Sequence, residues 1–144
     1  MIKEINNKMD YDHLLTESDP NINLVRDYLE NGALYGFYLK DEPVSFIAVE
    51  IIDGEVEIKN LLTLSEHRGH GYAKALIKFI EETYNSYDTF LVGTANSSLE
   101  NITFYTRLGY VDNVREFVNE VNNNENVDVQ IQQWNGSNLL LDVL

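Results

Sequence analysis

The chain has 144 residues, of which 44% are apolar, and a formal net charge of −14. This length fits one globular domain over residues 1–144, and the composition excludes a disordered chain. The absence of cysteine excludes disulfides, thiolate metal sites and a covalent cysteine intermediate. With three scattered histidines and no cysteine, we expect no metal site.

The acidity also limits the partners. A net charge of −14 makes nucleic acid a poor partner for the whole protein and favours a cationic one, such as an amine. No run of apolar residues is long enough for a membrane span, and the N-terminal residues lack an apolar signal core. We therefore expect a cytoplasmic protein without a membrane partner.

The first half of the chain reads as a helix followed by three strands. The helix is predicted at 18–32, with Ser18 or Asp19 as N-cap, Pro20 in the first turn and Gly32 at its end. Strand-like runs follow at 33–40, 44–52 and 55–64. Asp53-Gly54 between the last two runs is a hairpin signal, so the three strands form an antiparallel meander.

The second half alternates helices and strands. A helix begins near Tyr72, with apolar residues at helical spacing, and residues 89–95 suit a buried strand. A further helix is predicted at 96–110, with Ser97 and Glu100 at capping-box spacing and Gly109 as its stop. Residues 119–130 read as a polar loop before a last strand at 138–143. This order predicts an α/β protein with one mixed sheet.

The sequence Arg-Gly-His-Gly at 68–71 stands between the third strand and a helix. Glycines there allow a ligand to approach the backbone, and the N–H groups of a helix N-terminus attract anions. A P-loop would need Gly-Lys-Ser/Thr, and a dinucleotide fingerprint would need a third glycine where Lys74 stands. The pattern Arg/Gln-x-x-Gly-x-Gly/Ala fits in full through Arg68, Gly71 and Ala73. Such a turn is also a plain helix entrance in many proteins.

That pattern resembles the pyrophosphate loop of the GNAT acyl-CoA N-acyltransferases. The resemblance extends to "VEIKNLLTLSEHRGHGYAKALI" and to "FLVGTANSSLENITFYTRLGY", which is similar to the strand–helix–Gly-Tyr segment of small bacterial members. It covers nearly the whole chain and is weakest at 111–134. His67 and Thr63 depart from the tyrosine and valine common in the family. The resemblance implies the GNAT fold: a mixed, mostly antiparallel sheet with splayed central parallel strands, flanked by helices.

The resemblance also implies the cosubstrate and its contacts. Acetyl-CoA would place its pantetheine in the gap between the splayed strands, paired like an added strand. Its pyrophosphate would lie on the loop. Lys74 and Lys78 are equally typical of a solvated helix face, and His70 of an exposed loop. Asn96 could bind the cofactor or serve as a turn residue, and Asn101 is a further candidate. The implied cofactor-binding residues are Leu62, Thr63, Leu64, Arg68, Gly69, His70, Gly71, Tyr72, Ala73, Lys74, Asn96 and Asn101.

Two residues match family positions with catalytic roles. Tyr105 matches the general acid that protonates the leaving thiolate, although a tyrosine on an amphipathic helix is usually a core residue. Glu57 matches a position that draws a proton from the amine, although a carboxylate on a strand is often only solvated. The expected reaction is acetyl transfer from acetyl-CoA to a primary amine by direct transfer in a ternary complex.

Several points stay open from the sequence. The alternatives are a GNAT-fold module that binds acyl-CoA without turnover and an unrelated phosphate-loop protein. The acceptor is a small-molecule or peptide amine of unknown identity. The last strands could pair between two chains, which would give a homodimer.

Overall fold

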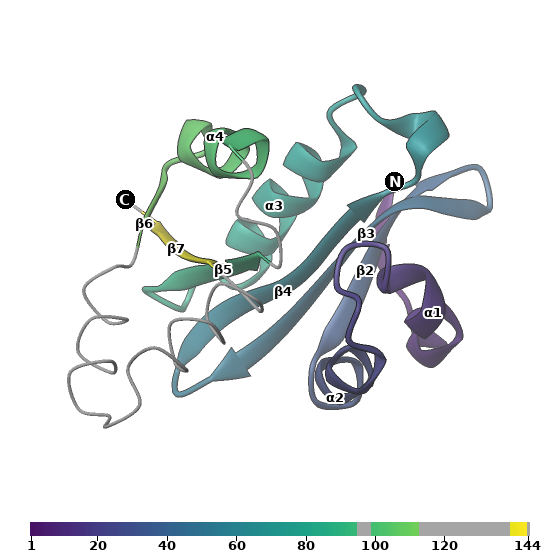
Figure 1. The fold of residues 1–144 in the computed structure, drawn as a ribbon, viewed down its shortest axis with the longest axis horizontal. Coiled ribbons are helices and arrows are strands. Elements are labelled where there is room, and N and C mark those ends of the chain that lie inside the picture. Colours follow the sequence, from purple (N-terminus) through teal and green to yellow (C-terminus); the bar gives the residue numbers. More distant parts are fainter. Residues whose placement is uncertain (95–98, 113–138, 144) are drawn as a thin grey trace. The chain divides into compact units, whose positions relative to one another are not determined.

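The computed structural model describes residues 1–94, 99–112 and 139–143, and Figure 1 shows the elements that they form. The chain divides into two compact units, Met1–Phe90 and Leu91–Leu144. The first unit contains β1 (Ile2–Glu4), the 3-10 helix η1 (Lys8–Tyr11), α1 (Asp12–Leu15), α2 (Ile22–Asn31), β2 (Ala33–Leu39), β3 (Glu42–Ile52), β4 (Glu55–Thr63), the 3-10 helix η2 (Ser65–His67) and α3 (Tyr72–Thr83).

Strands β1 to β4 pair in chain order, and each neighbouring pair is antiparallel. The predicted meander is therefore confirmed, and β1 adds an N-terminal strand that the sequence analysis did not find. The predicted hairpin turn between β3 and β4 is also confirmed. Asp53 and Gly54 have φ angles of 51° and 77°, the left-handed pair that a two-residue hairpin turn needs.

Helices cover both faces of this four-stranded sheet (Figure 1). Side-chain alternation along β2 assigns the faces. Leu34 belongs to an apolar core with residues of α1 and α2, whereas the ring of Tyr35 lies 5.3 Å from that of Phe79 in α3. The first core, which also includes Phe46 and Leu62 of the sheet, fixes α1 and α2 against one face.

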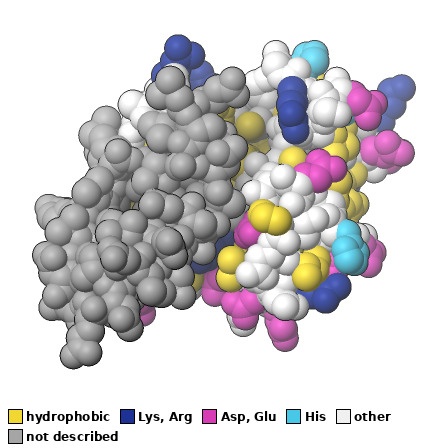
Figure 2. Space-filling model, viewed as in Figure 1, with side chains coloured by type: hydrophobic (Ala, Val, Ile, Leu, Met, Phe, Trp, Pro, Cys, Tyr) yellow, Lys and Arg dark blue, Asp and Glu magenta, His cyan; other side chains and the backbone are white. Residues whose placement is uncertain are grey.

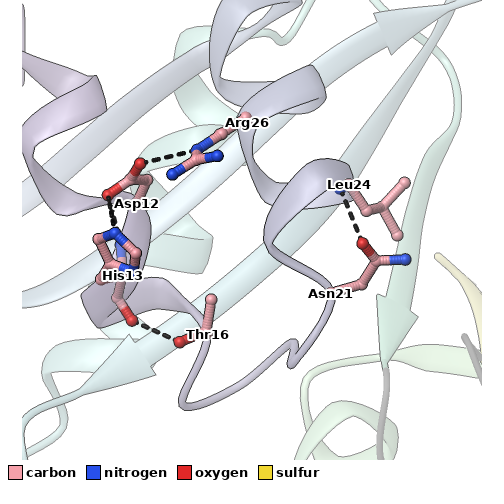
Figure 3. A network of polar contacts seen from close by, with 6 residues as sticks. All are labelled: Asp12, His13, Thr16, Asn21, Leu24 and Arg26. Atoms are coloured by element: carbon pink, nitrogen blue, oxygen red, sulfur yellow. Dashed lines mark hydrogen bonds and ion pairs between the residues drawn. The ribbon is translucent and has the colours of Figure 1, made fainter.

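Helix α2 begins later than predicted. Its N-cap is Asn21, whose side chain accepts a hydrogen bond from the Leu24 N–H at 3.2 Å (Figure 3). The helix begins after the predicted caps, Ser18 and Asp19, and after Pro20, which was expected in its first turn. The Asp19 carboxylate instead accepts a hydrogen bond from the N–H of Asn21. Gly32 follows the last helical residue, as predicted.

Helix α1 and the 3-10 helix before it were not predicted. An ion pair ties α1 to α2: the Arg26 Nε lies 3.0 Å from the Asp12 carboxylate (Figure 3). Arg26 thereby lowers the pKa of Asp12, although burial acts in the opposite direction. The ion pair therefore joins the first residue of α1 to the middle of α2.

Strand β4 carries one extra residue relative to β3. Ala48 pairs with Asn60, but Val49 pairs with Ile58, so Lys59 is bulged. The bulge shifts side-chain alternation in the first half of β4. Paired residues share a face, so Glu57 opposite Glu50 lies on the α2 face, as does Asn60 opposite Ala48.

The second unit contains the rest of β5 (Phe90–Thr94), then α4 (Leu99–Arg107), β6 (Tyr110–Asp112) and β7 (Leu139–Val143). Strand β7 pairs antiparallel with β5 and with β6, so both of its edges are occupied within the chain. The expected homodimer stays a prediction, and β7 offers no free edge at which two chains could pair. The capping box at Ser97 and the loop at 119–130 lie outside the described residues.

The fold class is confirmed as a mixed α/β protein with mostly antiparallel strands. The expected opening between central parallel strands concerns β4 and β5, which fall in different units, and it stays a prediction, as does the single domain. Within the described parts of the chain, no helix is both long and apolar enough to cross a membrane.

Candidate active site

The loop between η2 and α3 is built on two left-handed glycines. Gly69 and Gly71 both have φ angles of 81°, and Gly71 is the N-cap of α3. This backbone conformation favours glycine, because a side chain there meets the following carbonyl. A Cβ added at either glycine would have nothing within 4 Å, so the loop presents bare backbone to open space.

Helix α3 begins directly behind this open loop. Its N-cap makes no side-chain hydrogen bond. The first N–H groups of a helix have no partner in the helix, and they carry the positive end of its dipole. This arrangement of the backbone suits an anion, and the binding of one by Gly69 to Lys74 stays a prediction.

Side chains around the loop are ordered by contacts with the backbone and with each other. Arg68 Nε donates to the Thr63 carbonyl at 3.2 Å. His70 Nδ1 lies 3.1 Å from the His67 carbonyl, and because a carbonyl only accepts, Nδ1 carries the proton. The His70 ring stacks on Tyr72, which stacks on Phe37 of β2. These contacts hold Arg68 and His70 beside the glycines, with both side chains exposed.

The end of β4 has a defined hydrogen-bonding direction. The Leu64 N–H donates to the Val44 carbonyl of β3 at 2.9 Å, so Leu64 and Leu62 direct their polar groups toward β3. By alternation, Leu61 and Thr63 direct theirs away from β3. Among Leu62, Thr63 and Leu64, only Thr63 directs its backbone groups away from β3, as Leu61 also does; pairing of this part of β4 with pantetheine stays a prediction.

A buried hydroxyl fixes that edge from the β3 side. Ser45 is fully buried; its Oγ lies 3.2 Å from the Leu62 carbonyl and 2.7 Å from the Thr63 hydroxyl. The single Ser45 proton serves the carbonyl, which can only accept, so Thr63 donates to Ser45. The threonine that departs from the family pattern therefore has a partner, which sequence inspection did not reveal.

Glu57 lies on the α2 face of β4 and forms an ion pair with the bulged residue. Lys59 Nζ is 3.0 Å from its carboxylate, and the two side chains are 24% and 18% exposed for Lys59 and Glu57 respectively. The Glu57 carboxylate is thus partly buried beside the Lys59 ammonium. On a regular strand two residues separated by one position share a face, but Lys59 is bulged, so alternation alone does not establish this ion pair.

Tyr105 lies in α4 of the second unit and is 6% exposed. Its ring makes edge contacts with Phe104 and Tyr110, at centroid distances of 5.1 and 5.9 Å. Burial raises the pKa of Tyr105 well above its ordinary value. The phenol therefore keeps its proton at neutral pH, which a general acid requires.

The other predicted residues are placed only in part. Asn101 belongs to α4, while Asn96 lies outside the described residues. Among residues 1–94, 99–112 and 139–143, no three His, Asp or Glu side chains are grouped so that they could hold a metal ion.

Comparisons with known proteins place this arrangement in a family. Residues 30–112, more than half of the chain, match the acetyltransferase (GNAT) domain. An uncharacterized N-acetyltransferase of Bacillus subtilis, YvbK, is 30% identical over 111 residues, covering 75% of this chain and 70% of that protein.

Solved structures agree. A Bacillus subtilis acetyltransferase in complex with CoA has a TM-score of 0.69 and 27% identity, covering 77% of this chain and 76% of that one. A GNAT family acetyltransferase from Elizabethkingia anophelis with acetyl-CoA bound has a TM-score of 0.68 and 24% identity, covering 78% and 76%. These matches exclude an unrelated phosphate-loop protein. The chain belongs to the GNAT family and is an N-acetyltransferase.

Proposed function

We propose that this enzyme transfers an acetyl group from acetyl-CoA to a primary amine, directly and within a ternary complex. The observation that carries the proposal is the open loop with two left-handed glycines at the N-terminus of α3, beside an edge of β4 whose Thr63 carbonyl faces outward. A related acetyltransferase at 27% identity is known in complex with CoA, which supports the same cosubstrate here.

In this proposal the pyrophosphate binds the N–H groups of residues 69–74, with Arg68 as an additional positive charge. Arg68 already lies against the Thr63 carbonyl, so the guanidinium is held at the junction of the strand and the loop. A guanidinium carries five N–H groups, so Arg68 can bond the Thr63 carbonyl and still donate to a phosphate. Pantetheine amides would pair with the outward groups of Leu61 and Thr63 as an added strand.

The acetyl transfer itself needs one base and one acid. Glu57 accepts a proton from the substrate ammonium, directly or through water, and the neutral amine attacks the thioester carbonyl. A C–N bond forms, the C–S bond breaks, and the departing thiolate takes the proton of the Tyr105 hydroxyl. The raised pKa of Tyr105 keeps that proton in place until the thiolate forms.

Two measurements test the proposal. The first is a thermal melt with acetyl-CoA, with ATP and NAD as controls. A ligand at 100 times its dissociation constant adds about 2.7 kcal/mol, so we expect a rise of roughly 5–10 °C with acetyl-CoA alone. No rise at saturating acetyl-CoA would contradict the cosubstrate assignment.

The second measurement assigns the acid. Tyr105→Phe should keep acetyl-CoA binding and lose most amine-dependent thiol release at neutral pH. Tyr110→Phe is the matched control, because Tyr110 is also a buried tyrosine of the same unit. Unchanged turnover in Tyr105→Phe would show that another group protonates the thiolate. Acetyl-CoA binding without turnover on any amine would favour the non-catalytic alternative.

A further inference from the structure

Three aromatic side chains stack between the sheet and the glycine loop. The ring of Phe37 in β2 stacks on that of Tyr72, the first residue of α3, with the centroids 4.4 Å apart. The ring of Tyr72 stacks in turn on that of His70, with the centroids 5.6 Å apart and the planes inclined by 14°. We name Phe37, Tyr72 and His70 the ring column. Offset, nearly parallel contacts of this kind are favourable between flat rings.

Exposure increases along the ring column. Phe37 and Tyr72 are half-buried, whereas His70 is exposed. Figure 2 shows histidine at the surface of the segment that joins β4 to α3. Among the described residues, Tyr72 is the only ring that stacks on His70. The column therefore ends on an imidazole whose second face is open to solvent.

A hydrogen bond also holds the His70 ring in its plane. The ring Nδ1 donates to the His67 carbonyl at 3.1 Å. With one nitrogen bonded and one face stacked, the imidazole is restrained although it is exposed. A side chain that is ordered before its ligand arrives loses less conformational entropy when the ligand binds. The open face of His70 is therefore suited to stack on a flat ligand.

The proposed cosubstrate carries a flat ring close to its phosphates. In the proposed function the pyrophosphate binds the N–H groups of residues 69–74, which include that of His70 itself. In CoA a single ribose separates the pyrophosphate from the adenine. An adenine joined to a pyrophosphate on this loop is therefore within reach of the His70 ring. Aromatic side chains bind nucleobases by stacking, because every base has a flat π face.

We propose that the adenine of acetyl-CoA stacks on the open face of His70, and that Tyr72 and Phe37 are positioning residues that hold the His70 ring. This inference rests on the proposed function, since it takes acetyl-CoA as the cosubstrate. It goes further by assigning the base a side-chain contact, in addition to the backbone groups assigned to the phosphates. Stacking requires a ring at position 70, whereas a contact with a phosphate would require a positive charge there.

The test compares a ligand that has the base with one that lacks it. We would measure the affinity of each variant for acetyl-CoA and for S-acetyl-4′-phosphopantetheine, which has no adenosine, by isothermal titration. His70→Ala should bind acetyl-CoA roughly 5- to 20-fold more weakly than the wild type, because it loses the stacking of one base. Its affinity for S-acetyl-4′-phosphopantetheine should be unchanged.

Two more variants separate the ring from the charge. His70→Phe keeps a ring without a charge and should bind acetyl-CoA as the wild type does. His70→Lys keeps a charge without a ring and should be as weak as His70→Ala. His13→Ala is the control for the loss of an exposed histidine, because His13 is 81% exposed and lies in α1. It should bind both ligands with wild-type affinity.

The positioning role of Tyr72 has its own pair of variants. Tyr72→Phe keeps the ring and should bind acetyl-CoA with wild-type affinity. Tyr72→Leu removes the support of His70 and should lose part of the affinity for acetyl-CoA, but none for S-acetyl-4′-phosphopantetheine. Equal affinities of these two variants for acetyl-CoA would overturn the positioning role.

Four results would overturn the stacking of adenine on His70. They are unchanged affinity of His70→Ala for acetyl-CoA, an equal loss with both ligands, failure of His70→Phe to restore binding, and wild-type affinity in His70→Lys. Each of them leaves acetyl-CoA as the cosubstrate. If the wild-type protein does not bind acetyl-CoA, the proposed function fails first, so the two failures are distinguishable.

Discussion

Replacing Gly71 by alanine tests the role of the glycine loop most directly. In the free protein the new Cβ meets no atom within 4 Å, so the change introduces no clash. Its effect on stability comes from the φ of 81° alone, a left-handed conformation that costs an alanine about 1–2 kcal/mol. For a domain of this size, that lowers Tm by roughly 3–8 °C.

The effect on acetyl-CoA should be larger and separate. If the pyrophosphate lies on the bare backbone at Gly71, the methyl group occupies ligand space and pushes the phosphates off the N–H groups. A hydrogen bond to a charged group contributes about 1.5–3 kcal/mol. Losing one such bond weakens acetyl-CoA binding roughly 10- to 100-fold. The assay is isothermal titration of each variant with acetyl-CoA, below its own melting temperature.

Gly54→Ala provides a matched control. Gly54 has a φ of 77°, and a Cβ there also meets nothing within 4 Å, but it lies in the turn between β3 and β4. Both variants should therefore lose similar stability, and only Gly71→Ala should lose affinity. Wild-type affinity in Gly71→Ala, with the expected drop in Tm, would refute the reasoning that places a ligand on this loop.

Three further predictions concern stability. Burial, with Asp27 and Glu57 nearby, raises the pKa of Glu50 in the folded protein above its value in the unfolded chain. The free energy of unfolding therefore falls as pH rises from the unfolded to the folded pKa. Glu50→Gln should raise Tm at pH 7.5, and the gain should vanish near pH 4. Arg26 lowers the pKa of Asp12 in the folded protein. Their ion pair therefore stabilises the fold at pH values above the unfolded pKa of Asp12, and this stabilisation is lost as pH falls through the folded pKa. Asp12→Asn should lower Tm at pH 7 and match the wild type at pH 2. Ser45→Ala removes the buried Ser45 hydroxyl that bonds the Thr63 hydroxyl, and should cost about 1–3 kcal/mol in urea unfolding. The loss in the double variant with Thr63→Val should be less than additive.

Much of the local structure could be predicted from the sequence, because its causes are local. Asp53-Gly54 specified a left-handed turn, and with it the β3–β4 hairpin. Glycines at 69 and 71 specified the conformation of the loop before α3. The N-cap of α2 was predicted wrongly, at Ser18 or Asp19: the structure uses Asn21, because Asp19 bonds Tyr28 and the Asn21 N–H instead.

The composition of the candidate site depended on pairing between strands. The bulge at Lys59 decides which face Glu57 occupies, and therefore that it lies with Glu50 on the side of α2. The ladder between β3 and β4 decides that Leu61 and Thr63, rather than Leu62 and Leu64, direct their polar groups outward. The sequence by itself determined the loop, the turn and the family resemblance. Strand register decided the rest, because a shift of one residue reverses every side chain and every N–H group that follows it.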